Sequence, residues 1–280
     1  MQYRFQPLLK GLYITTELII AVLAIIGNFL VCLAITRNKK LRTVTNYFLV
    51  SLAVSDILVG LVAIPCAMLT DLELFVLLQS SILSLLAVAA ERYMAILLPF
   101  QYQHVMSPRN AHLALLVTWG LGAISGTDMN EGEETVYCIF PCMVDMSYMV
   151  YFNFFCCLLV PLAAMFIIYG HIFLTVRRQL RCIASSVAKS NMRKELGKAT
   201  FLFLVLFLFM VCWMPIHIIN CVLLFCPRCE VPMSLIVAAI LFSHANSALN
   251  PILYAYRMRS FRHTLTGMWR GMWSVRPKHH

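Results

Sequence analysis

Seven long apolar stretches follow one another along this 280-residue chain, separated by short polar segments. A helix needs about 20 mostly apolar residues to cross the hydrocarbon core of a bilayer. Only helices and closed barrels satisfy their backbone hydrogen bonds there, so the pattern predicts an all-α membrane protein, a bundle of seven transmembrane helices. The predicted spans are Leu12–Thr36, Val44–Leu69, Leu72–Leu97, Ala111–Gly126, Met146–Val176, Ala199–Phe225 and Val231–Tyr256.

The composition agrees with a polytopic membrane protein. The chain is 61% hydrophobic and only 12% charged, which is about half the charged fraction of a typical soluble domain. The net charge of +10 raises the question of a nucleic-acid partner. However, the basic residues lie in short segments between apolar runs, as in cytoplasmic loops, so no nucleic acid is expected. The first apolar run is too long for a signal peptide, and no cleavable signal is expected.

The distribution of charge predicts the orientation in the membrane. Basic segments follow the first, third, fifth and seventh spans, whereas the loops on the other side are acidic. Because cytoplasmic loops carry the excess of Lys and Arg, we expect the N-terminus outside and the C-terminus in the cytoplasm. The loop between the fifth and sixth spans holds Arg177, Arg178, Arg181, Lys189, Arg193, Lys194 and Lys198.

The segment after the last span has a different pattern. Within Met258–Trp273, basic residues alternate with bulky apolar ones. This pattern predicts a short amphipathic helix along the inner leaflet, and a frayed basic tail is the alternative. The chain is therefore divided into a receptor-like bundle over residues 1–256 and an amphipathic helix with a basic tail over residues 257–280.

Eleven cysteines do not indicate a disulfide scaffold here, since several lie inside apolar stretches as small packing residues. Four fall in loops that are predicted to face outside, where disulfides persist. Cys226 and Cys229 have CxxC spacing, which fits a redox pair, half a metal site or a local structural disulfide. In a short outer loop the disulfide is favoured.

Short motifs follow one another through the predicted spans in a specific order. Together they resemble the rhodopsin-like (class A) G-protein-coupled receptors. They are Gly27-Asn28, Ser51–Asp56, Glu91-Arg92-Tyr93, Trp119, Pro161 with Tyr169, Cys212–Pro215, and Asn250-Pro251-x-x-Tyr254. Longer segments are similar to the adenosine receptors in particular, over nearly the whole chain. These segments are Thr45–Phe48, Gln79–Ile82, Met146–Phe155, His217–Cys221, Ser243–Ser247 and Asn250–Tyr256.

The resemblance implies a plasma-membrane receptor that binds adenosine or a related purine nucleoside and activates a heterotrimeric G protein. Membrane lipid and a second receptor are further expected partners. No cofactor is expected beyond a bound sodium ion. The alternative is a truncated or divergent relative with impaired binding and no signalling of its own. A transporter is disfavoured because inverted repeats are missing, and an enzyme because the outward pocket offers no nucleophile–base pair.

The predicted ligand site lies in the outer half of the bundle. Trp213, His217 and Asn220 share one helical face because they are four and three residues apart. An Asn side chain can hold an adenine through one donor and one acceptor. The resemblance gives Asn220 this role, whereas residue type alone would favour a hydrogen bond to a neighbouring helix. The other ligand-binding residues that the resemblance implies are Phe140 (stacking on the purine), Met149, Ile240, Ser243, His244, Glu17 and Gln79.

Glu17 lies inside the first predicted span and needs a polar partner there. The obvious partner is His244, because a carboxylate fixes the tautomer and orientation of an imidazole. The alternative is a Glu17 near the outer boundary that reaches water.

A second polar group lies in the middle of the bundle. The resemblance implies that it surrounds a sodium ion, and one carboxylate with several hydroxyl and amide oxygens suits a hard cation. A water-filled hydrogen-bond network without an ion is the alternative. The predicted ion site comprises Asp56, Ser81, Asn246 and Asn250, with Asn28, Trp213 and Ser247 around it.

At the cytoplasmic end, the resemblance implies a two-state switch. Arg92 is expected to pair with Glu91 and Glu195 in the inactive state. Release of these pairs would let Arg92 meet Tyr169, Tyr254 and the G protein.

Three departures from the family pattern stand out. The link from Pro65 to Gln79 is about a dozen residues shorter, which removes the usual partner of Cys138 and leaves Cys142 as the nearest substitute. The predicted fourth span of 16 residues reaches only about 24 Å. Leu78 and Pro141 stand where adenosine receptors have Thr and, often, Glu, so weaker agonist binding or a shifted ligand preference is expected.

Overall fold

The computed structural model describes residues 7–38, 41, 43–65, 75–105, 107–127, 147–182, 186–226, 228–257 and 261–267, and contains no β-strand in these ranges. The main helices are α1 (Pro7–Arg37), α2 (Val44–Leu58), α4 (Phe75–Leu97), α5 (Pro99–Val105), α6 (Pro108–Thr127), α7 (Val160–Cys182), α8 (Ser186–Phe225) and α9 (Met233–Arg257). Two π-helices adjoin them, η2 (Val59–Ala63) after α2 and η4 (Tyr148–Leu159) before α7. One further short helix covers residues 261–267.

Six helical segments in the described part of the chain are long and apolar enough to cross a membrane. They correspond to the predicted first, second, third, fifth, sixth and seventh spans. These segments are Lys10–Arg37, Val44–Ala63, Leu77–Leu97, Val150–Cys182, Ser186–Phe225 and Met233–Tyr256.

The fourth span, α6, is less apolar, and its predicted length was wrong. It has 20 residues, which at 1.5 Å per residue reach about 30 Å, the thickness of the hydrocarbon core. The helix begins three residues before the predicted start because Ser107 caps it, with its Oγ accepting the backbone N–H of Asn110 at 3.2 Å. Pro108 follows at the first helical position, where a missing N–H costs nothing.

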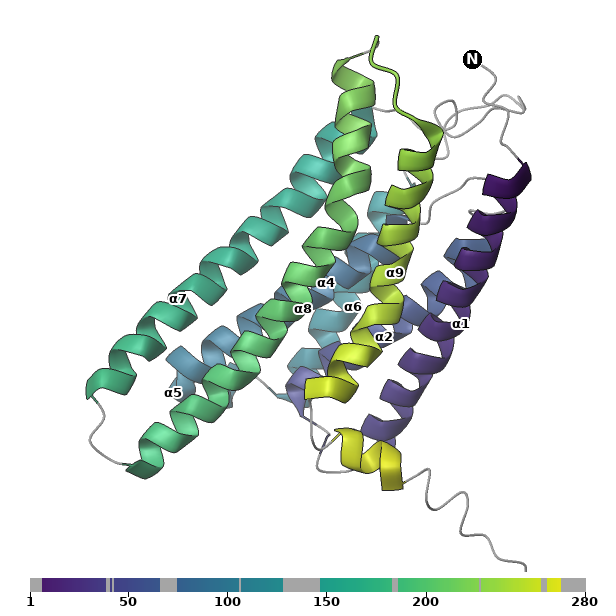
Figure 1. Ribbon diagram of the computed structural model, residues 1–280. Helices are drawn as coiled ribbons and strands as arrows, with labels where there is room; N and C mark the ends of the chain where they lie inside the picture. The colour runs from purple at the N-terminus through teal and green to yellow at the C-terminus, as the bar shows by residue number, and fades with distance from the viewer. Residues whose placement is uncertain are drawn as a thin grey trace, which may run out of the picture.

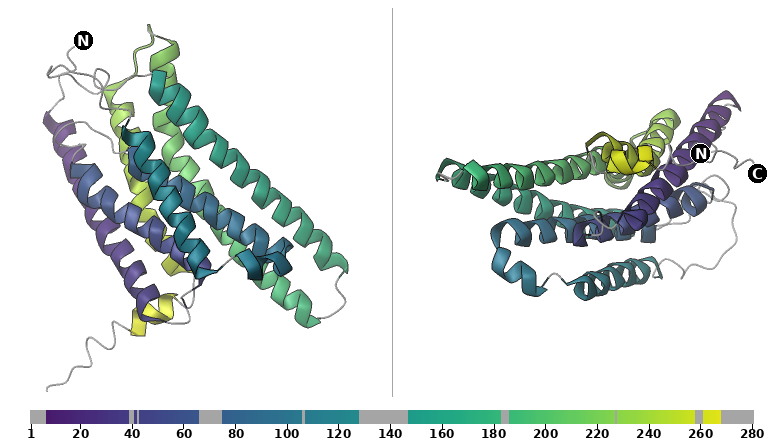
Figure 2. Two further views of the ribbon diagram at one scale, coloured as in Figure 1. Left: turned by 180° about the vertical axis from the view of Figure 1, so that it is seen from behind. Right: turned by 90° about the horizontal axis from the view of Figure 1, so that it is seen from below.

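Helices α1, α2, α4, α7, α8 and α9 each pack against the next, and α9 packs against α1 (Figures 1 and 2). Helix α1 packs against α2 and α9, and α8 packs against both α7 and α9. Helix α4 contacts α2, α7 and α8, while α6 lies at the margin against α4 and α2. A seven-helix bundle therefore accounts for all the predicted spans.

The predicted amphipathic helix is present in its described part, residues 261–267. Its apolar side is anchored by Phe261, which is buried beside Val31 and Tyr254. Asn38 Nδ2 donates a hydrogen bond to Thr264 Oγ1 at 2.9 Å. The short helix is thus fixed to the C-terminal ends of α1 and α9, and the rest of Met258–Trp273 lies outside the described residues.

Helices α1 and α9 are in tight contact at Gly27. A Cβ atom at this position would lie 2.9 Å from Cγ of Pro251. A proline ring cannot move aside as a flexible side chain does, so the contact requires glycine. The Gly27 of the sequence motif is therefore explained by packing.

We expect Gly27→Ala to lower the unfolding temperature of the detergent-solubilised protein, because overpacking costs about 1–3 kcal/mol. Gly170→Ala in α7 is the matched control, since a Cβ there would meet nothing within 4 Å. The control should gain up to about 1 kcal/mol from helix propensity. If both variants shift the unfolding temperature in the same direction, the packing account of Gly27 is wrong.

Candidate functional site

A buried polar group occupies the middle of the bundle, between α2 and α9. Asn250 Nδ2 donates a hydrogen bond to Asp56 Oδ2 at 2.8 Å, and Asp56 is only 1% exposed. Ser81 on α4 and Asn246 on α9 are also buried. The four predicted ion-site residues thus come from three neighbouring helices.

Asn28 extends this group to α1. Its Nδ2 donates to the backbone oxygens of Ala24 at 2.9 Å and of Ser247 at 2.8 Å. Its Oδ1 is buried and has no hydrogen-bond partner among the described residues. A carboxylate, buried hydroxyls and an amide oxygen left without a donor together form a donor set that fits a hard cation.

Serine pairs join α2 to α4 beside this group. Ser51 and Ser84 Oγ atoms lie 3.2 Å apart, and so do those of Ser55 and Ser80. Trp119 Nε1 on α6 donates to Ser51 Oγ at 3.0 Å. Sequence reasoning missed this two-rung ladder, although the four-residue spacing within each helix places each pair on one face.

The C-terminal half of α8 presents a row of buried polar groups. Trp213 Nε1, both ring nitrogens of His217 and Oδ1 of Asn220 have no hydrogen-bond partner in the described part of the chain. Asn220 Oδ1 therefore does not bond a described neighbouring helix, which was the alternative for this residue. The His217 ring stacks on Phe154 of η4, with centroids 5.2 Å apart. Each buried unpaired polar group costs about 1–3 kcal/mol, so a row of them calls for an explanation.

Glu17 and His244 form a buried pair. His244 Nδ1 lies 2.8 Å and 3.0 Å from the two carboxylate oxygens of Glu17. The Glu17 side chain is 0% exposed, so it does not reach water as the alternative required. Next to it on α9, the Ser243 hydroxyl donates to the backbone oxygen of Ile240 at 2.7 Å. The pair connects the N-terminal half of α1 to α9.

The remaining predicted ligand-site residues are only partly described. Leu78 is buried and Gln79 half-buried on α4, and Ile240 on α9 packs in the same apolar cluster as Trp213. Met149 belongs to η4, but its side chain lies outside the description. Phe140, Pro141, Cys138 and Cys142 also lie outside the described residues.

Near the C-terminal end of α4, Arg92 is held by two carboxylates. Its Nε donates to Glu91 Oε2 at 2.6 Å, and its Nη1 lies 3.4 Å from Glu195 Oε2 on α8. Glu195 is also paired with Lys198, whose Nζ lies 2.6 Å from Glu195 Oε1. Glu91 is fully buried and Arg92 nearly so. This ion-pair cluster links α4 to α8, as the switch hypothesis requires.

Two further residues complete the cluster, and sequence reasoning missed both. The Thr45 hydroxyl donates to Glu91 Oε2 at 3.0 Å, and the Tyr102 hydroxyl donates to Glu91 Oε1 at 2.9 Å. Burial and the neighbouring Glu91 carboxylate raise the pKa of Tyr102 to about 12, so it remains a donor at physiological pH. Tyr102 lies on α5, a short helix that no periodicity had indicated.

The two switch tyrosines, Tyr169 and Tyr254, are buried in aromatic contacts. Tyr169 packs edge-on against Phe203, with centroids 5.8 Å apart, and Tyr254 packs against Phe201 at 5.9 Å. The Tyr254 hydroxyl has no partner within the described ranges. In this structure neither tyrosine joins the Glu91–Arg92–Glu195 cluster.

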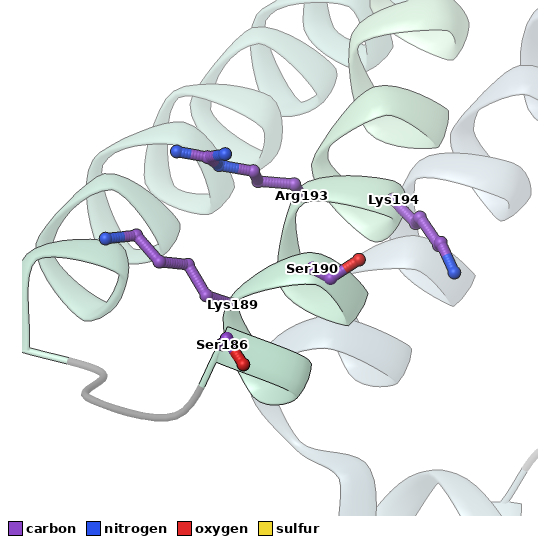
Figure 3. Close-up of a pocket in the computed structure, with 5 residues that line it drawn as sticks. All are labelled: Ser186, Lys189, Ser190, Arg193 and Lys194. Atoms are coloured by element: carbon purple, nitrogen blue, oxygen red, sulfur yellow. The ribbon is translucent and has the colours of Figure 1, made fainter.

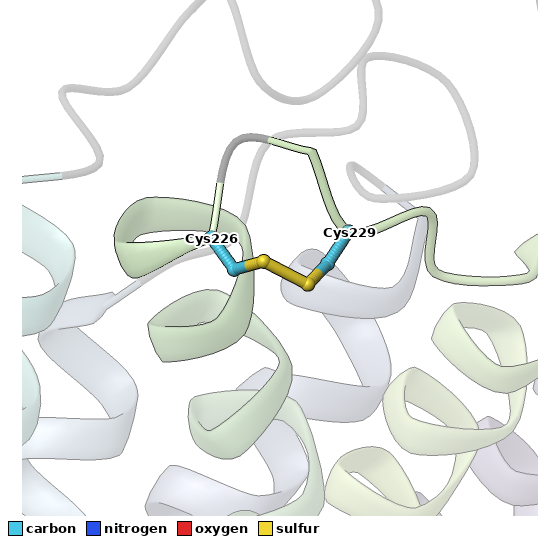
Figure 4. The surroundings of a disulfide bond; sticks show 2 residues. All are labelled: Cys226 and Cys229. Carbon is cyan, nitrogen blue, oxygen red and sulfur yellow. A yellow bond between two sulfur atoms is a disulfide. The ribbon is translucent and has the colours of Figure 1, made fainter.

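Cys226 and Cys229 form a disulfide between α8 and α9 (Figure 4), with their Cα atoms 5.3 Å apart. The bond confirms the local disulfide that the CxxC spacing predicted. It closes a short loop between the C-terminal end of α8 and the N-terminal end of α9.

The comparisons with known proteins agree with this geometry. The sequence profile described as "7 transmembrane receptor (rhodopsin family)" matches residues 27–254. The chain therefore belongs to the rhodopsin family of seven-transmembrane receptors, a class of multi-pass plasma-membrane proteins that are not enzymes. Within this family it is similar to adenosine receptor A2a of Homo sapiens, with 44% identity over 91% of this chain and 71% of the relative.

Two further relatives give the same result. The adenosine receptors A2a of Equus caballus and Canis lupus familiaris are each 44% identical over 90% of this chain and 70% of their own length. The alignment with the human receptor spans 293 positions, more than the 280 residues of this chain. The relative therefore carries insertions that this chain lacks, which agrees with the shortened link after Pro65.

We expect Glu17 and His244 to act as one unit in stability. Glu17→Ala and His244→Ala should each lower the unfolding temperature, because either leaves a buried polar partner unpaired at a cost of about 1–3 kcal/mol. The double variant should be no less stable than the worse single variant. Thermal unfolding of the three proteins measures the coupling, and strictly additive losses would contradict the pairing.

Proposed function

We propose that this chain is a receptor for adenosine or a related purine nucleoside that activates a heterotrimeric G protein. The observation that carries the proposal is the row of unpaired buried polar groups on the outer half of α8, at Trp213, His217 and Asn220. A polar ligand would satisfy them, while the surrounding apolar side chains would contact a flat ring. The family membership and the similarity to adenosine receptors support the ligand class.

Asn220 is the primary anchor for the base. Its amide offers one acceptor and one donor side by side, which matches the amine and adjacent ring nitrogen of an adenine. Phe140 would stack on the purine, and Met149 and Ile240 would form the walls above Trp213. The ring stack of His217 on Phe154 holds α8 against η4 and so keeps Asn220 in place.

His244 and Ser243 are the candidates for the sugar hydroxyls, with Gln79 on the α4 side. Glu17 accepts a hydrogen bond from His244 Nδ1, and this leaves Nε2 as the ring nitrogen available to a ligand. Because Glu17 has no contact with water, its role is to position His244. Ser243 donates to its own helix, so its oxygen would serve as an acceptor.

The cytoplasmic cluster supplies the switch. The pairs of Arg92 with Glu91 and Glu195 join α4 to α8 and hold the inactive arrangement. Their release would free Arg92 to meet Tyr169 and Tyr254. On α5, Phe100 is 88% exposed and lies two residues before Tyr102. The exposed Phe100 ring offers an apolar contact for the G protein. Ligand and G protein bias the same equilibrium, so their effects must be reciprocal.

A sodium ion fits the central polar group. The ion would be held by Asp56, Ser81, Asn246 and Asn250. The Asn28 Oδ1 atom is buried without a hydrogen-bond donor among the described residues, which supports an electropositive partner such as this ion nearby. When bound, the ion would compensate the buried Asp56 carboxylate, and Asn250 would keep that carboxylate oriented.

The remaining assignments follow from charge. We place the N-terminus outside and the C-terminus in the cytoplasm, with residues 1–256 as the receptor domain and residues 257–280 as amphipathic helix and tail. Lipid contacts and pairing with a second receptor complete the proposed partners.

The short third and fourth spans were the reason for considering a non-signalling relative. Helix α4 has 23 residues and α6 has 20, which is the length that a membrane-crossing helix needs, so this reason no longer applies.

Replacing Asn220 by Ala should weaken adenosine binding roughly 10- to 100-fold, the cost of losing a bidentate contact to a base. Radioligand competition on membranes measures this loss. Asn191→Ala, an exposed Asn on the same helix, is the matched control and should bind as the wild type does. Equal affinity in the two variants would remove Asn220 from the site and the nucleoside assignment with it.

The Leu78→Thr variant tests the departure from the family pattern. It should raise agonist affinity about 5-fold, because a hydroxyl at this buried position restores a hydrogen bond to the sugar. The competition assay used for Asn220 provides the measurement. Unchanged affinity would mean that Leu78 does not line the sugar end of the site.

Glu195→Ala should raise basal nucleotide exchange on the G protein, since it removes one of the two ion pairs of Arg92. Glu195 is partly exposed, so solvent screening limits the pair to about 1 kcal/mol, or about 5-fold in the equilibrium. Ligand-free exchange, with Glu230→Ala in the outer loop as control, gives the measurement. A variant with normal adenosine binding and unaltered basal exchange would contradict the switch.

A further inference from the structure

Two phenylalanines on one turn of α8 each contact one of the switch tyrosines. The Phe203 ring meets the Tyr169 ring of α7 edge-on, with centroids 5.8 Å apart and planes at 72°. The Phe201 ring meets the Tyr254 ring of α9 at 5.9 Å and 67°. Successive residues of an α-helix are about 100° apart around its axis, so residues two apart point to nearly opposite sides. The two rings therefore reach two different helices, α7 and α9, which both pack against α8.

On the α7 side, Phe203 lies among three aromatic rings. Phe166, Tyr169 and Phe173 are three and four residues apart, so they share one face of α7. The Phe203 ring is edge-on to all three, with centroid distances of 5.7, 5.8 and 5.8 Å. Edge-on rings at such separations attract each other beyond the effect of their burial. These contacts hold Tyr169 against α8.

On the α9 side, packing alone holds the Tyr254 ring. Its side chain is 1% exposed, and its hydroxyl has no hydrogen-bond partner in the described part of the chain. A buried hydroxyl without a partner is unfavourable, so this tyrosine would gain by moving to a position where its hydroxyl is paired. Phe201 and Phe261, both buried beside it, keep it where it is.

The turns of α8 before these rings have a different character (Figure 3). No aromatic residue lies between Ser186 and Phe201. On α8, Phe201 and Phe203 are therefore the aromatic rings nearest to Glu195. The side chains of the first turns are basic or hydroxylic, are mostly exposed and extend to different sides of the helix: Ser186, Lys189, Ser190, Arg193 and Lys194.

A bend at Pro215 would move both rings. Phe203 lies 12 residues and Phe201 14 residues before Pro215, which corresponds to about 18 and 21 Å of helix. A tilt of about 10° away from the bundle displaces the rings by roughly 3–4 Å, which takes their centroids beyond the range of about 7 Å over which rings interact. The same tilt displaces Glu195 by roughly 5 Å, enough to break its 3.4 Å pair with Arg92. One movement thus breaks the ring contacts and the ion pair.

We propose that Phe201 and Phe203 form a tyrosine clamp, a second latch that keeps Tyr169 and Tyr254 away from Arg92 until α8 moves. The clamp acts on the Arg92 switch and therefore rests on the proposed function. Because it is apolar, it restrains α8 independently of the ion pairs of Arg92. Because both rings belong to α8, movement of this one helix releases both tyrosines together.

Basal nucleotide exchange on the G protein, with the full-length receptor in nanodiscs and no ligand, tests the clamp. Phe201→Leu and Phe203→Leu keep an apolar side chain but remove the ring, and each should raise exchange about 3- to 10-fold. The double variant should show roughly the product of the two effects, because the two rings share no ring partner. Phe207→Leu is the matched control. This ring is 44% exposed on the same helix and is in no ring contact with a described residue, so its loss should leave exchange unchanged.

Adenosine affinity separates a latch from a packing defect. A released clamp populates the active state and should tighten adenosine binding about 2-fold or more. Weaker binding in both leucine variants would mean loosened packing and would overturn the clamp.

Glu195→Ala in the same exchange assay distinguishes the two possible failures. If it raises exchange while Phe201→Leu and Phe203→Leu match the Phe207→Leu control, the switch stands and the clamp is overturned. If none of these variants raises exchange although adenosine still binds, the switch itself is overturned, and the clamp with it.

Discussion

The hydrocarbon core of a bilayer offers no hydrogen-bond partner, and this single constraint explains most of the structure. Every polar side chain inside a span has to find its partner in the protein. Asn28, Asp56 and Asn250 do so by linking α1, α2 and α9, and Glu17 does so through His244. The polar residues that a membrane should reject are therefore the ones that hold the helices together.

Four of the six buried polar atoms that lack a partner among the described residues lie in one place. Trp213, His217 and Asn220 are buried on one face of α8 with polar atoms that no described residue satisfies. Their cost is tolerated because most of the other buried polar groups described are paired, including the serine ladder between α2 and α4. A protein that satisfies most of its buried polar groups and leaves a row of them unsatisfied on one helical face is arranged to bind something polar.

Much of the fold could be predicted from the sequence because apolar length alone identifies a membrane helix. The fourth span was underestimated because its start depends on a local Ser107-Pro108 cap and not on hydropathy. Helix α5 was missed because seven residues are too few to show a period. The pair Glu17–His244 was anticipated because a carboxylate inside a span needs a polar partner, and Arg92–Glu195 through family resemblance. Thr45 and Tyr102 were not, since only the folded chain brings them to Glu91.

The two ends of the proposed mechanism lie on the same element. Helix α8 carries Asn220 near its outer end and Glu195 near its inner end, in one continuous helix of 40 residues. Pro215, between them, removes one backbone hydrogen bond and so provides a place for the helix to bend. In the proposed mechanism, a ligand that fixes Asn220 would change the orientation of the C-terminal half of α8, and the rigid N-terminal half would convert a small rotation into a larger displacement at Glu195. Glu195 pairs with Arg92 on α4, and this ion pair is either formed or broken. A continuous motion of α8 would therefore switch the protein between two discrete states.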